Sequence, residues 1–406
     1  MVSRIRMARG AAAAAMMCGL LSACGGGDDT SKDGSFVIGV IEDRSGGSTF
    51  YSQAAVAALK AYVKSINAGE NIYAADALGD SKGILDKAVS LVFEDDQNNP
   101  TNTPLKVRAL ISKGADAIMF TSGSSSTLQG RVVCQQEKIF CAAPTNVNGG
   151  IVEAPNNEFI FTAAPTSGLT AGAYIDAWKK AGYSNIAYFS ENSATSQGLV
   201  DAYKSAAEKA GLKTVANESV EIGARDAVSQ VSRIDKSGAD VVFDATQAAA
   251  QSALLYKGLA QINSDIPRWA NNAITAQPKM WEIVGKNVDG LRVVDPYSPE
   301  NKNAKELAQL LTDHGVTSPV TFIQTTVWDS LLLMKKSFDD TKSADGAKAI
   351  ASLEKITDFP SATGQDSFTY SFGPGKHNAG RADQNVVVEF ADGKPSRLVD
   401  DLLPRP

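Results

Sequence analysis

The residues most suited to binding chemistry lie in the stretch from Gly114 to Thr127, which reads G-A-D-A-I-M-F-T-S-G-S-S-S-T. A buried strand is expected over 117–120 and a helix over 128–136, with a turn rich in hydroxyl groups between them. The N-terminus of a helix carries unpaired N–H groups and a partial positive charge, and therefore receives anions well. The stretch thus predicts a site for the carboxylate of a small molecule. The alternative is that the serines only cap the helix, a position that Ser and Thr favour without any ligand.

Composition limits the chemistry that this chain of 406 residues can perform. The net charge of −6 argues against a nucleic-acid surface and leaves small solutes or proteins as partners. The two histidines, His314 and His377, offer little for acid–base or metal chemistry. The sequence also lacks H-E-x-x-H, P-loop and metal-spaced Cys/His patterns. We therefore expect no enzyme, no cofactor, no metal site and a monomer, and the length predicts two domains.

The first residues have the order of an export signal. Arginines at positions 4, 6 and 9 precede a short apolar core at 11–21, which is too short to span a bilayer as a mature helix. L-S-A-C then ends at Cys24, and a segment rich in Gly and Asp follows. This order resembles a bacterial lipobox, which implies a signal peptide over 1–23, lipid on Cys24 and a flexible tether over 24–35. The alternative is an ordinary secretory signal with a chance cysteine.

The resemblance to a lipobox also implies a location, periplasmic or at the cell surface, with the protein anchored by lipid to a bacterial membrane. In that oxidising compartment the two remaining cysteines of the mature chain, Cys134 and Cys141, are permitted to form a disulfide. Whether they do depends on their geometry, so the sequence leaves the pairing open.

Buried strands alternate with amphipathic helices along most of the chain, which predicts an α/β protein with doubly wound parallel sheets. The segment S-K-G-A-D-A-I-M-F at 112–120 has an echo, K-S-G-A-D-V-V-F-D, at 236–244, in keeping with two similar halves. Short β segments are expected in the tail after residue 364. The expected strands of the body are 36–41, 89–93, 117–120, 138–143, 185–189, 214–220, 239–243, 266–270 and 290–294, and the expected helices include 53–67, 103–112, 166–181, 197–210, 226–236, 248–260, 278–284, 302–312, 321–338 and 346–356.

Several short motifs occur in a fixed order over nearly all of the mature chain. They are D-R-S-G at 43–46, S-I-N-A at 65–68, F-E-D-D at 93–96, S-G-S-S-S-T at 122–127, A-A-P-T-N at 142–146 and S-A-T-G at 361–364. Together they resemble the substrate-binding proteins of bacterial ABC importers, of the branched-chain amino acid (Leu/Ile/Val) type. The resemblance implies a type I periplasmic-binding fold, in which two doubly wound parallel-sheet lobes are joined by three crossovers and close on a ligand.

The resemblance also implies where the chain passes between the lobes. The crossovers are expected near 162–166, 291–297 and 364–372. The expected lobes are 36–163 plus 298–365 for the first, and 164–297 plus 366–403 for the second.

Ligands of open parallel sheets sit beyond the carboxyl ends of the strands. By the resemblance, Ser124 lies where the family binds the ligand carboxylate with a serine hydroxyl and nearby N–H groups. Thr145 or Asn146 lies on the loop that holds the carboxylate and the ammonium. Tyr51 or Phe50 matches an aromatic residue that lines the cleft, although such a residue also suits simple packing.

Other positions depart from the family pattern. Arg44 could grip a carboxylate through two parallel hydrogen bonds, or it could be a surface residue. The acidic residue that often pairs with the ligand ammonium is replaced by Asn271 and Asn272. A buried ammonium needs a partner, and Asp244 could supply it, unless Asp244 only caps a helix in solvent. The complete set of expected ligand-binding residues is Arg44, Ser45, Tyr51, Ser122, Ser124, Ser125, Thr145, Asn146, Asn192, Asp244 and Asn272.

The function expected from these observations is an extracytoplasmic solute-binding lipoprotein. It would deliver a small carboxylate-bearing solute, an amino acid or a related acid or amide, to the permease subunits of an ABC importer. The alternative is a ligand-sensing binding protein for a membrane receptor, because the same two-lobed switch serves either partner.

Overall fold

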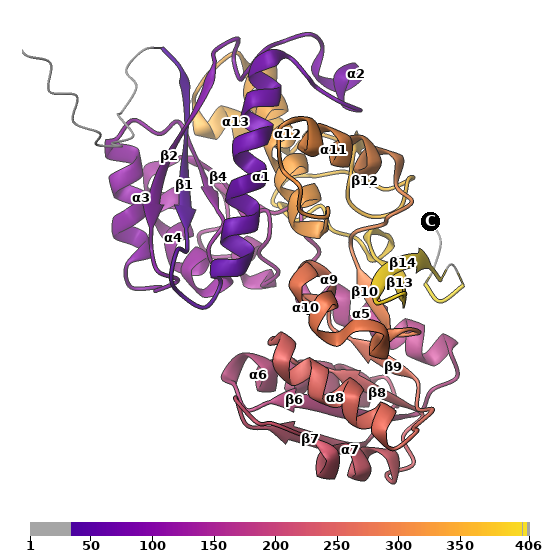
Figure 1. Ribbon diagram of the computed structural model, residues 1–406. Helices are drawn as coiled ribbons and strands as arrows, with labels where there is room; N and C mark the ends of the chain where they lie inside the picture. Colours follow the sequence, from indigo (N-terminus) through magenta and orange to yellow (C-terminus); the bar gives the residue numbers. More distant parts are fainter. Residues whose placement is uncertain (1–33, 400, 404–406) are drawn as a thin grey trace, which may run out of the picture.

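The computed structural model describes residues 34–399 and 401–403 and shows two α/β lobes, one above the other in Figure 1. The expected signal peptide, Cys24 and the tether up to residue 33 lie outside the described residues. Among the residues that are described, no helix is both long and apolar enough to cross a membrane.

The first lobe is built on a five-stranded parallel sheet in the order β2-β1-β3-β4-β5. Every residue of the interior strand β1 is buried, as expected for an apolar strand that is covered by helices on both faces. The strands are β1 (Phe36–Glu42), β2 (Val89–Asp95), β3 (Ala117–Phe120), β4 (Phe140–Ala142) and β5 (Ile160–Phe161), and the helices are α1 (Thr49–Ala68), α2 (Ala75–Leu78), α3 (Thr103–Ser112), α4 (Ser124–Glu137), η1 (Gly149–Val152), α11 (Lys302–Asp313), α12 (Phe322–Thr341) and α13 (Gly346–Leu353).

The second lobe contains a seven-stranded sheet in the order β14-β13-β10-β9-β8-β6-β7. Its body is parallel as expected, but the last two strands pair antiparallel at one edge. Asp392 and Gly393 join them with positive φ angles of 51° and 73°, which a two-residue hairpin turn favours. The strands are β6 (Asn185–Glu191), β7 (Lys213–Val220), β8 (Val241–Asp244), β9 (Arg268–Ala270), β10 (Arg292–Asp295), β13 (Val386–Ala391) and β14 (Lys394–Leu398), and the helices are α5 (Ser167–Lys180), α6 (Ala194–Lys209), α7 (Val228–Asp235), α8 (Ala249–Gln261), α9 (Ala273–Ala276), α10 (Pro278–Val284), η2 (Gly285–Val288) and η3 (Ala382–Gln384).

The connection between the lobes differs from the expectation in the tail. The side chains of Phe368, Tyr370 and Phe372 pack in the core of the first lobe, and β12 (Thr369–Tyr370) pairs with β11 (Phe359–Pro360). The ring of Phe372 lies 5.9 Å from that of Phe161 in β5. The segment after residue 365 therefore stays with the first lobe, because its aromatic side chains fill that core, and the chain reaches the second sheet only at β13.

A buried carboxylate organises the segment that leads to one crossover. Asp329 of α12 is fully buried and accepts hydrogen bonds from Tyr73 (2.5 Å), Tyr370 (3.0 Å), Ser361 (2.9 Å), Thr363 (2.7 Å) and the N–H group of Ala362 (3.0 Å). Gly364, the residue after Thr363, pairs with Tyr297, which follows β10 of the second lobe. Asp329 thus fixes the first-lobe side of this crossover.

The structure settles the pairing of the two cysteines. Cys134 near the end of α4 and Cys141 in β4 form a disulfide with Cα atoms 6.4 Å apart. Both side chains are fully buried. The bridge thus joins α4, which begins at Ser124, to β4, which leads into the loop of Thr145 and Asn146. These three residues are candidate ligand contacts.

Candidate ligand-binding site between the lobes

The serine-rich stretch forms the first turn of α4. Gly123 occupies the N-cap position, and the helix begins at Ser124, four residues earlier than expected. The N-cap residue is a glycine, which has no side chain to cap this end, so the serines do not act as the N-cap residue. The first intrahelical bond runs from the N–H group of Thr127 to the carbonyl of Gly123. The N–H groups of residues 124–126, which precede this first bond in α4, point out of the helix end and can therefore bind an anion.

Ser124 lies against the loop that follows β4. Its Oγ is 3.4 Å from Oδ1 of Asn146, which is buried. The amide nitrogen of Asn146 lies 3.5 Å from the carbonyl oxygen of Phe120 at the end of β3. Thr145 is half-buried and Ser125 is exposed. The structure thus brings Ser124 and Asn146 together at neighbouring strand ends.

Two further loops of the first lobe converge on the same helix end. The N–H group of Gly123 donates to Oδ1 of Asn98 at 3.0 Å. A Cβ atom on Gly123 would collide with Asn98 and lie 3.0 Å from Oγ of Ser48. A side chain at position 123 would therefore displace the side chain of Asn98 and its hydrogen bond to this helix end.

The expected site residues at the β1–α1 loop have other partners. The buried Asp43 accepts hydrogen bonds from the N–H groups of Ser45 (3.1 Å), Gly46 (2.5 Å) and Ser48 (2.8 Å), so this loop already holds a carboxylate of the protein itself. Arg44 forms an ion pair with Glu42 at 2.5 Å, its side chain is 60% exposed, and the hydrogen bond to Glu42 raises its pKa. Within the described part of the chain, the hydrogen bond of the Ser124 side chain goes to Asn146 and not to Arg44 or Ser45.

Ser122 is buried and donates to Asp96 at 2.9 Å. Asp96 also accepts from the hydroxyl of Thr103, at 2.8 Å, in the first turn of α3. Ser122 therefore has a protein partner already, and its contact holds the turn that presents Gly123.

Tyr51 of α1 is the expected residue that reaches the second lobe. Burial raises the pKa of Tyr51 to about 12, and the second-lobe residues Gln277 and Asp295 lie close enough to affect that pKa. Its neighbour Phe50 stacks edge-on against it, with ring centroids 5.6 Å apart. Tyr51 thus marks where the two lobes meet.

The expected residues of the second lobe are engaged within that lobe. Asn192 is exposed and donates to Glu221 at 3.1 Å. Asp244 is buried and accepts hydrogen bonds from Ser252 and from Tyr256 (2.8 Å), and burial raises its pKa. The idea that Asp244 caps a helix in solvent is therefore wrong. Asn272 is half-buried, and none of these three residues is in contact with Ser124.

Sequence reasoning missed two acidic residues at the strand ends of the second lobe. Asp295 ends β10 with 1% of its surface exposed, accepts from the N–H group of Tyr297 (2.6 Å) and the hydroxyl of Thr275, and has its pKa raised to about 7 by burial. Glu191 ends β6, accepts from the N–H group of Gln247 at 3.0 Å, and also has its pKa raised by burial. Each of the two is an acidic residue at the end of an apolar strand, and this sequence pattern could have predicted both as candidate site residues.

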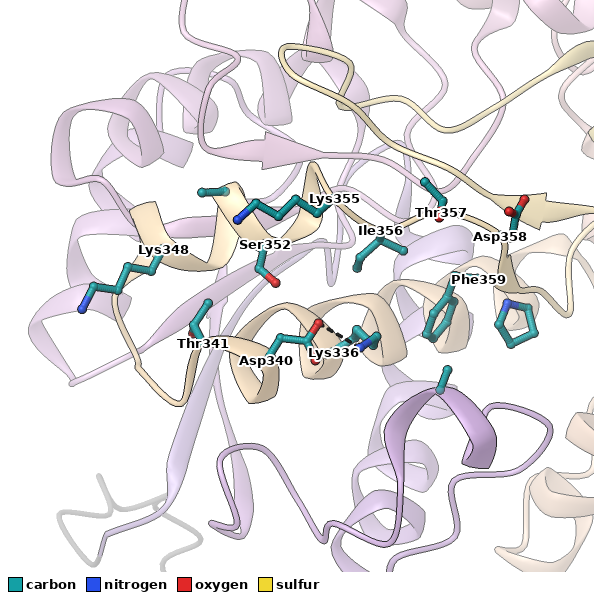
Figure 2. A pocket seen from close by; sticks show the side chains of 13 residues that line it. Lys336, Asp340, Thr341, Lys348, Ser352, Lys355, Ile356, Thr357, Asp358 and Phe359 are labelled. Carbon is teal, nitrogen blue, oxygen red and sulfur yellow. Dashed lines mark hydrogen bonds and ion pairs between the residues drawn. The ribbon is translucent and has the colours of Figure 1, made fainter.

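A surface cavity of about 630 Å³ lies away from these loops (Figure 2). It opens between α12 and α13, and its lysines include Lys336, which is paired with Asp340 at 2.7 Å. No cluster of three potential metal ligands occurs among the described residues.

Comparison with known proteins agrees with this architecture. The sequence model of the periplasmic binding protein family matches residues 35–387. The chain belongs to this family. The expected type I periplasmic-binding fold is confirmed, and the family consists of solute-binding proteins, so the protein is not an enzyme and acts outside the cytoplasm.

Two curated relatives are described as binding proteins. The Leu/Ile/Val-binding protein homolog 3 of Brucella melitensis is 22% identical over 280 residues, 68% of this chain and 75% of that protein. An amino acid binding protein of Pseudomonas aeruginosa is 28% identical over 173 residues, 42% of this chain and 46% of that protein.

Solved structures share the fold of this periplasmic binding protein at low identity. A leucine binding protein from Thermotoga maritima aligns with a TM-score of 0.69 and 18% identity, over 90% of this chain and all of that chain. A branched-chain amino acid transporter substrate binding protein from Streptococcus pneumoniae, in complex with isoleucine, aligns with a TM-score of 0.72 and 14% identity, over 92% of this chain and all of that chain.

Proposed function

We propose that this periplasmic binding protein is an extracytoplasmic lipoprotein that delivers a small carboxylate-bearing solute to an ABC importer. The solute would be an amino acid or a related acid or amide. The observation that carries the proposal is the N-terminus of α4, where the N-cap residue is a glycine without a side chain and where Ser124 lies beside Asn146. A carboxylate there would accept hydrogen bonds from N–H groups and a hydroxyl, and would meet the positive end of the helix dipole.

The position of this helix end supports a ligand that contacts both lobes. The loops after β1, β2, β3 and β4 converge at Gly123 and Asn146, at the carboxyl edge of the first sheet. From the same lobe, Tyr51 lies close to Gln277 of the second lobe. A solute held at α4 would favour the arrangement in which the lobes meet, because it would bind that arrangement more tightly than a separated one.

The residues present do not specify the chemical group that the ligand carries beside its carboxylate. Asp244 has its own donors in Ser252 and Tyr256, so we do not propose it as the partner of an ammonium group. The amides of Asn146 and Asn272 and the hydroxyl of Thr145 are neutral, and they suit amide or hydroxyl groups as well as an ammonium. The relatives named as Leu/Ile/Val-binding and amino acid binding proteins make amino acids the first solutes to test.

The test is a thermal-shift screen of the mature protein against amino acids, their amides and short carboxylic acids, followed by calorimetry. Binding to the native state alone raises its apparent stability. We expect at least one carboxylate to bind with a Kd near 1 µM or lower, about −8 kcal/mol. Binding of an amide at equal affinity to its parent acid would contradict a carboxylate site at α4.

The lipid anchor is tested separately at Cys24. The substitution Cys24→Ala should move the protein from the membrane pellet to the soluble extracytoplasmic fraction, because no acyl chain could then be attached. Retention of the variant in the pellet would overturn the anchor and leave the binding function untouched.

A further inference from the structure

The loop after β4 carries Asn146 of the candidate site and is hydrogen-bonded to the second lobe at the next residue, Val147. The carbonyl oxygen of Val147 accepts from the N–H group of Ser167 at 2.7 Å and from the hydroxyl of Ser167 at 3.1 Å. Ser167 is the first residue of α5, and Thr166 before it is the N-cap residue of that helix. The candidate site and the first helix of the second lobe therefore share a direct contact.

The helix α5 is fixed within the second lobe by its later turns. Tyr174 and Trp178 are fully buried in an apolar core of that lobe. The hydroxyl of Tyr174 donates to the carbonyl oxygen of Ala270 in β9 at 2.5 Å and lies 3.3 Å from that of Val294 in β10. Seven residues, or about 10 Å of helix, separate Tyr174 from Ser167. A movement of the second lobe therefore carries Ser167 with it.

The first lobe holds the loop on both sides of Val147. Thr162, which is buried at the start of the first crossover, donates to the carbonyl oxygen of Ala143 at 2.8 Å and lies 3.4 Å from that of Asn146. Further along the chain, Arg131 of α4 donates to two carbonyl oxygens of the segment that follows the loop, at 2.8 and 2.7 Å. A displacement of α5 therefore acts on the loop chiefly at Asn146 and Val147.

We propose that Ser167 is a positioning residue through which a solute at the N-terminus of α4 acts on the second lobe. The inference rests on the proposed solute-binding function and names the route of its conformational effect. When α5 turns relative to the first lobe, Val147 either follows and displaces Asn146 from Ser124, which lies 3.4 Å away, or it loses both bonds to Ser167. A solute that fixes Asn146 against Ser124 therefore favours one orientation of α5 over the others.

Proline at position 167 removes this contact and is compatible with the helix. The first helical position needs no N–H donor, and the fixed φ angle of proline suits it. Thr166 has φ −70° and ψ 156°, the conformation that a residue before proline adopts. Ser167→Pro therefore deletes both donors to Val147, whereas Ser167→Ala deletes only the hydroxyl. Gly168→Ala is the matched control in the same turn, because a Cβ atom there meets only Oγ1 of Thr166, at 4.0 Å.

The test is a double-mutant cycle, read by hydrogen exchange of the ligand-free mature protein. Asn146→Ala is introduced into the wild type and into each variant, and exchange is followed in the peptide that contains Tyr174, with α7 as the reference within the same lobe. In the wild type, Asn146→Ala should change exchange around Tyr174 at least about twofold, the lower end of the coupling between groups in contact. The same substitution should have no effect there in Ser167→Pro, a reduced effect in Ser167→Ala and the full effect in Gly168→Ala.

Equal effects of Asn146→Ala in the wild type and in Ser167→Pro would overturn the proposal, because a merely structural contact gives additive losses. An unchanged Tyr174 peptide in the wild type, or an equal change in α7, would overturn it as well. If Ser167→Pro does not fold, Ser167→Ala decides the matter, since it must reduce the effect of Asn146→Ala while Gly168→Ala must not. No solute is present in these measurements, so their failure would leave the proposed solute-binding function standing, and failure of the ligand screen would leave the coupling standing.

Discussion

The disulfide between Cys134 and Cys141 offers the sharpest prediction for stability. The double substitution Cys134→Ala/Cys141→Ala removes a bridge that spans seven positions of the chain. The closed loop of about eight residues corresponds to about 2.5 kcal/mol of lost loop-closure entropy in the unfolded chain at 25 °C. Both sulfur atoms are buried, so the smaller alanine side chains add a packing loss, and the total expected loss in the free energy of unfolding is about 3 kcal/mol.

The measurement is equilibrium unfolding in urea of the oxidised wild type and the double variant. Hydrogen exchange of the α4 and β4 amides would localise the effect, because these elements should lose the most protection. Addition of dithiothreitol should lower the stability of the wild type toward that of the variant and should not change the variant. A loss below about 1 kcal/mol would refute the reasoning, since it would mean that the loop between α4 and β4 is held closed equally well without the bridge.

Four substitutions test the site and the fold elsewhere. Ser124→Ala should weaken binding of the ligand by about 1–3 kcal/mol, because a hydrogen bond to a charged carboxylate is lost; unchanged affinity in calorimetry would remove Ser124 from the site. Arg44→Ala should leave that affinity unchanged, since the exposed guanidinium pairs with Glu42, and a tenfold weaker Kd would restore Arg44 as a ligand contact. Asp329→Asn should lower the free energy of unfolding by about 2–4 kcal/mol, because an amide cannot accept all the hydrogen bonds that the carboxylate receives; Tyr370→Phe, which removes one donor, should cost about 1 kcal/mol, and an equal loss in both variants would contradict this account.

Helix and strand positions could be predicted where local sequence decides them. The helices α3 and α10 have the bounds that the sequence predicts, 103–112 and 278–284, and each carries a proline in its first turn. The helix α4 was placed four residues too late, because a run of serines is typical of a cap, whereas the cap is Gly123. The close approach of Asn98 and Ser48 to that glycine involves residues far away in the sequence.

The candidate site could be predicted only in part, for the same reason. Ligands of open parallel sheets sit beyond the carboxyl ends of the strands, and this rule predicted the region of Ser124 and Asn146, which the structure brings together. It could not tell that Asp244 would be buried with Tyr256 of α8, nor that Arg44 would turn toward Glu42, because these pairings depend on side-chain directions in the folded protein. The rule could have included Asp295, but its proximity to Tyr51 of the other lobe is not visible in the sequence.

Neither apolar core is continuous along the chain. The core of the first lobe combines residues before position 164 with Ala276 and with others between 304 and 379, and that of the second lobe is completed by Val387 and Leu403. A polypeptide that emerges amino end first, from a ribosome or a secretion channel, cannot finish either core until almost all of it has emerged. Premature folding is therefore suppressed by topology alone, and loss of the last twenty residues should leave one lobe incomplete and exposed to proteases.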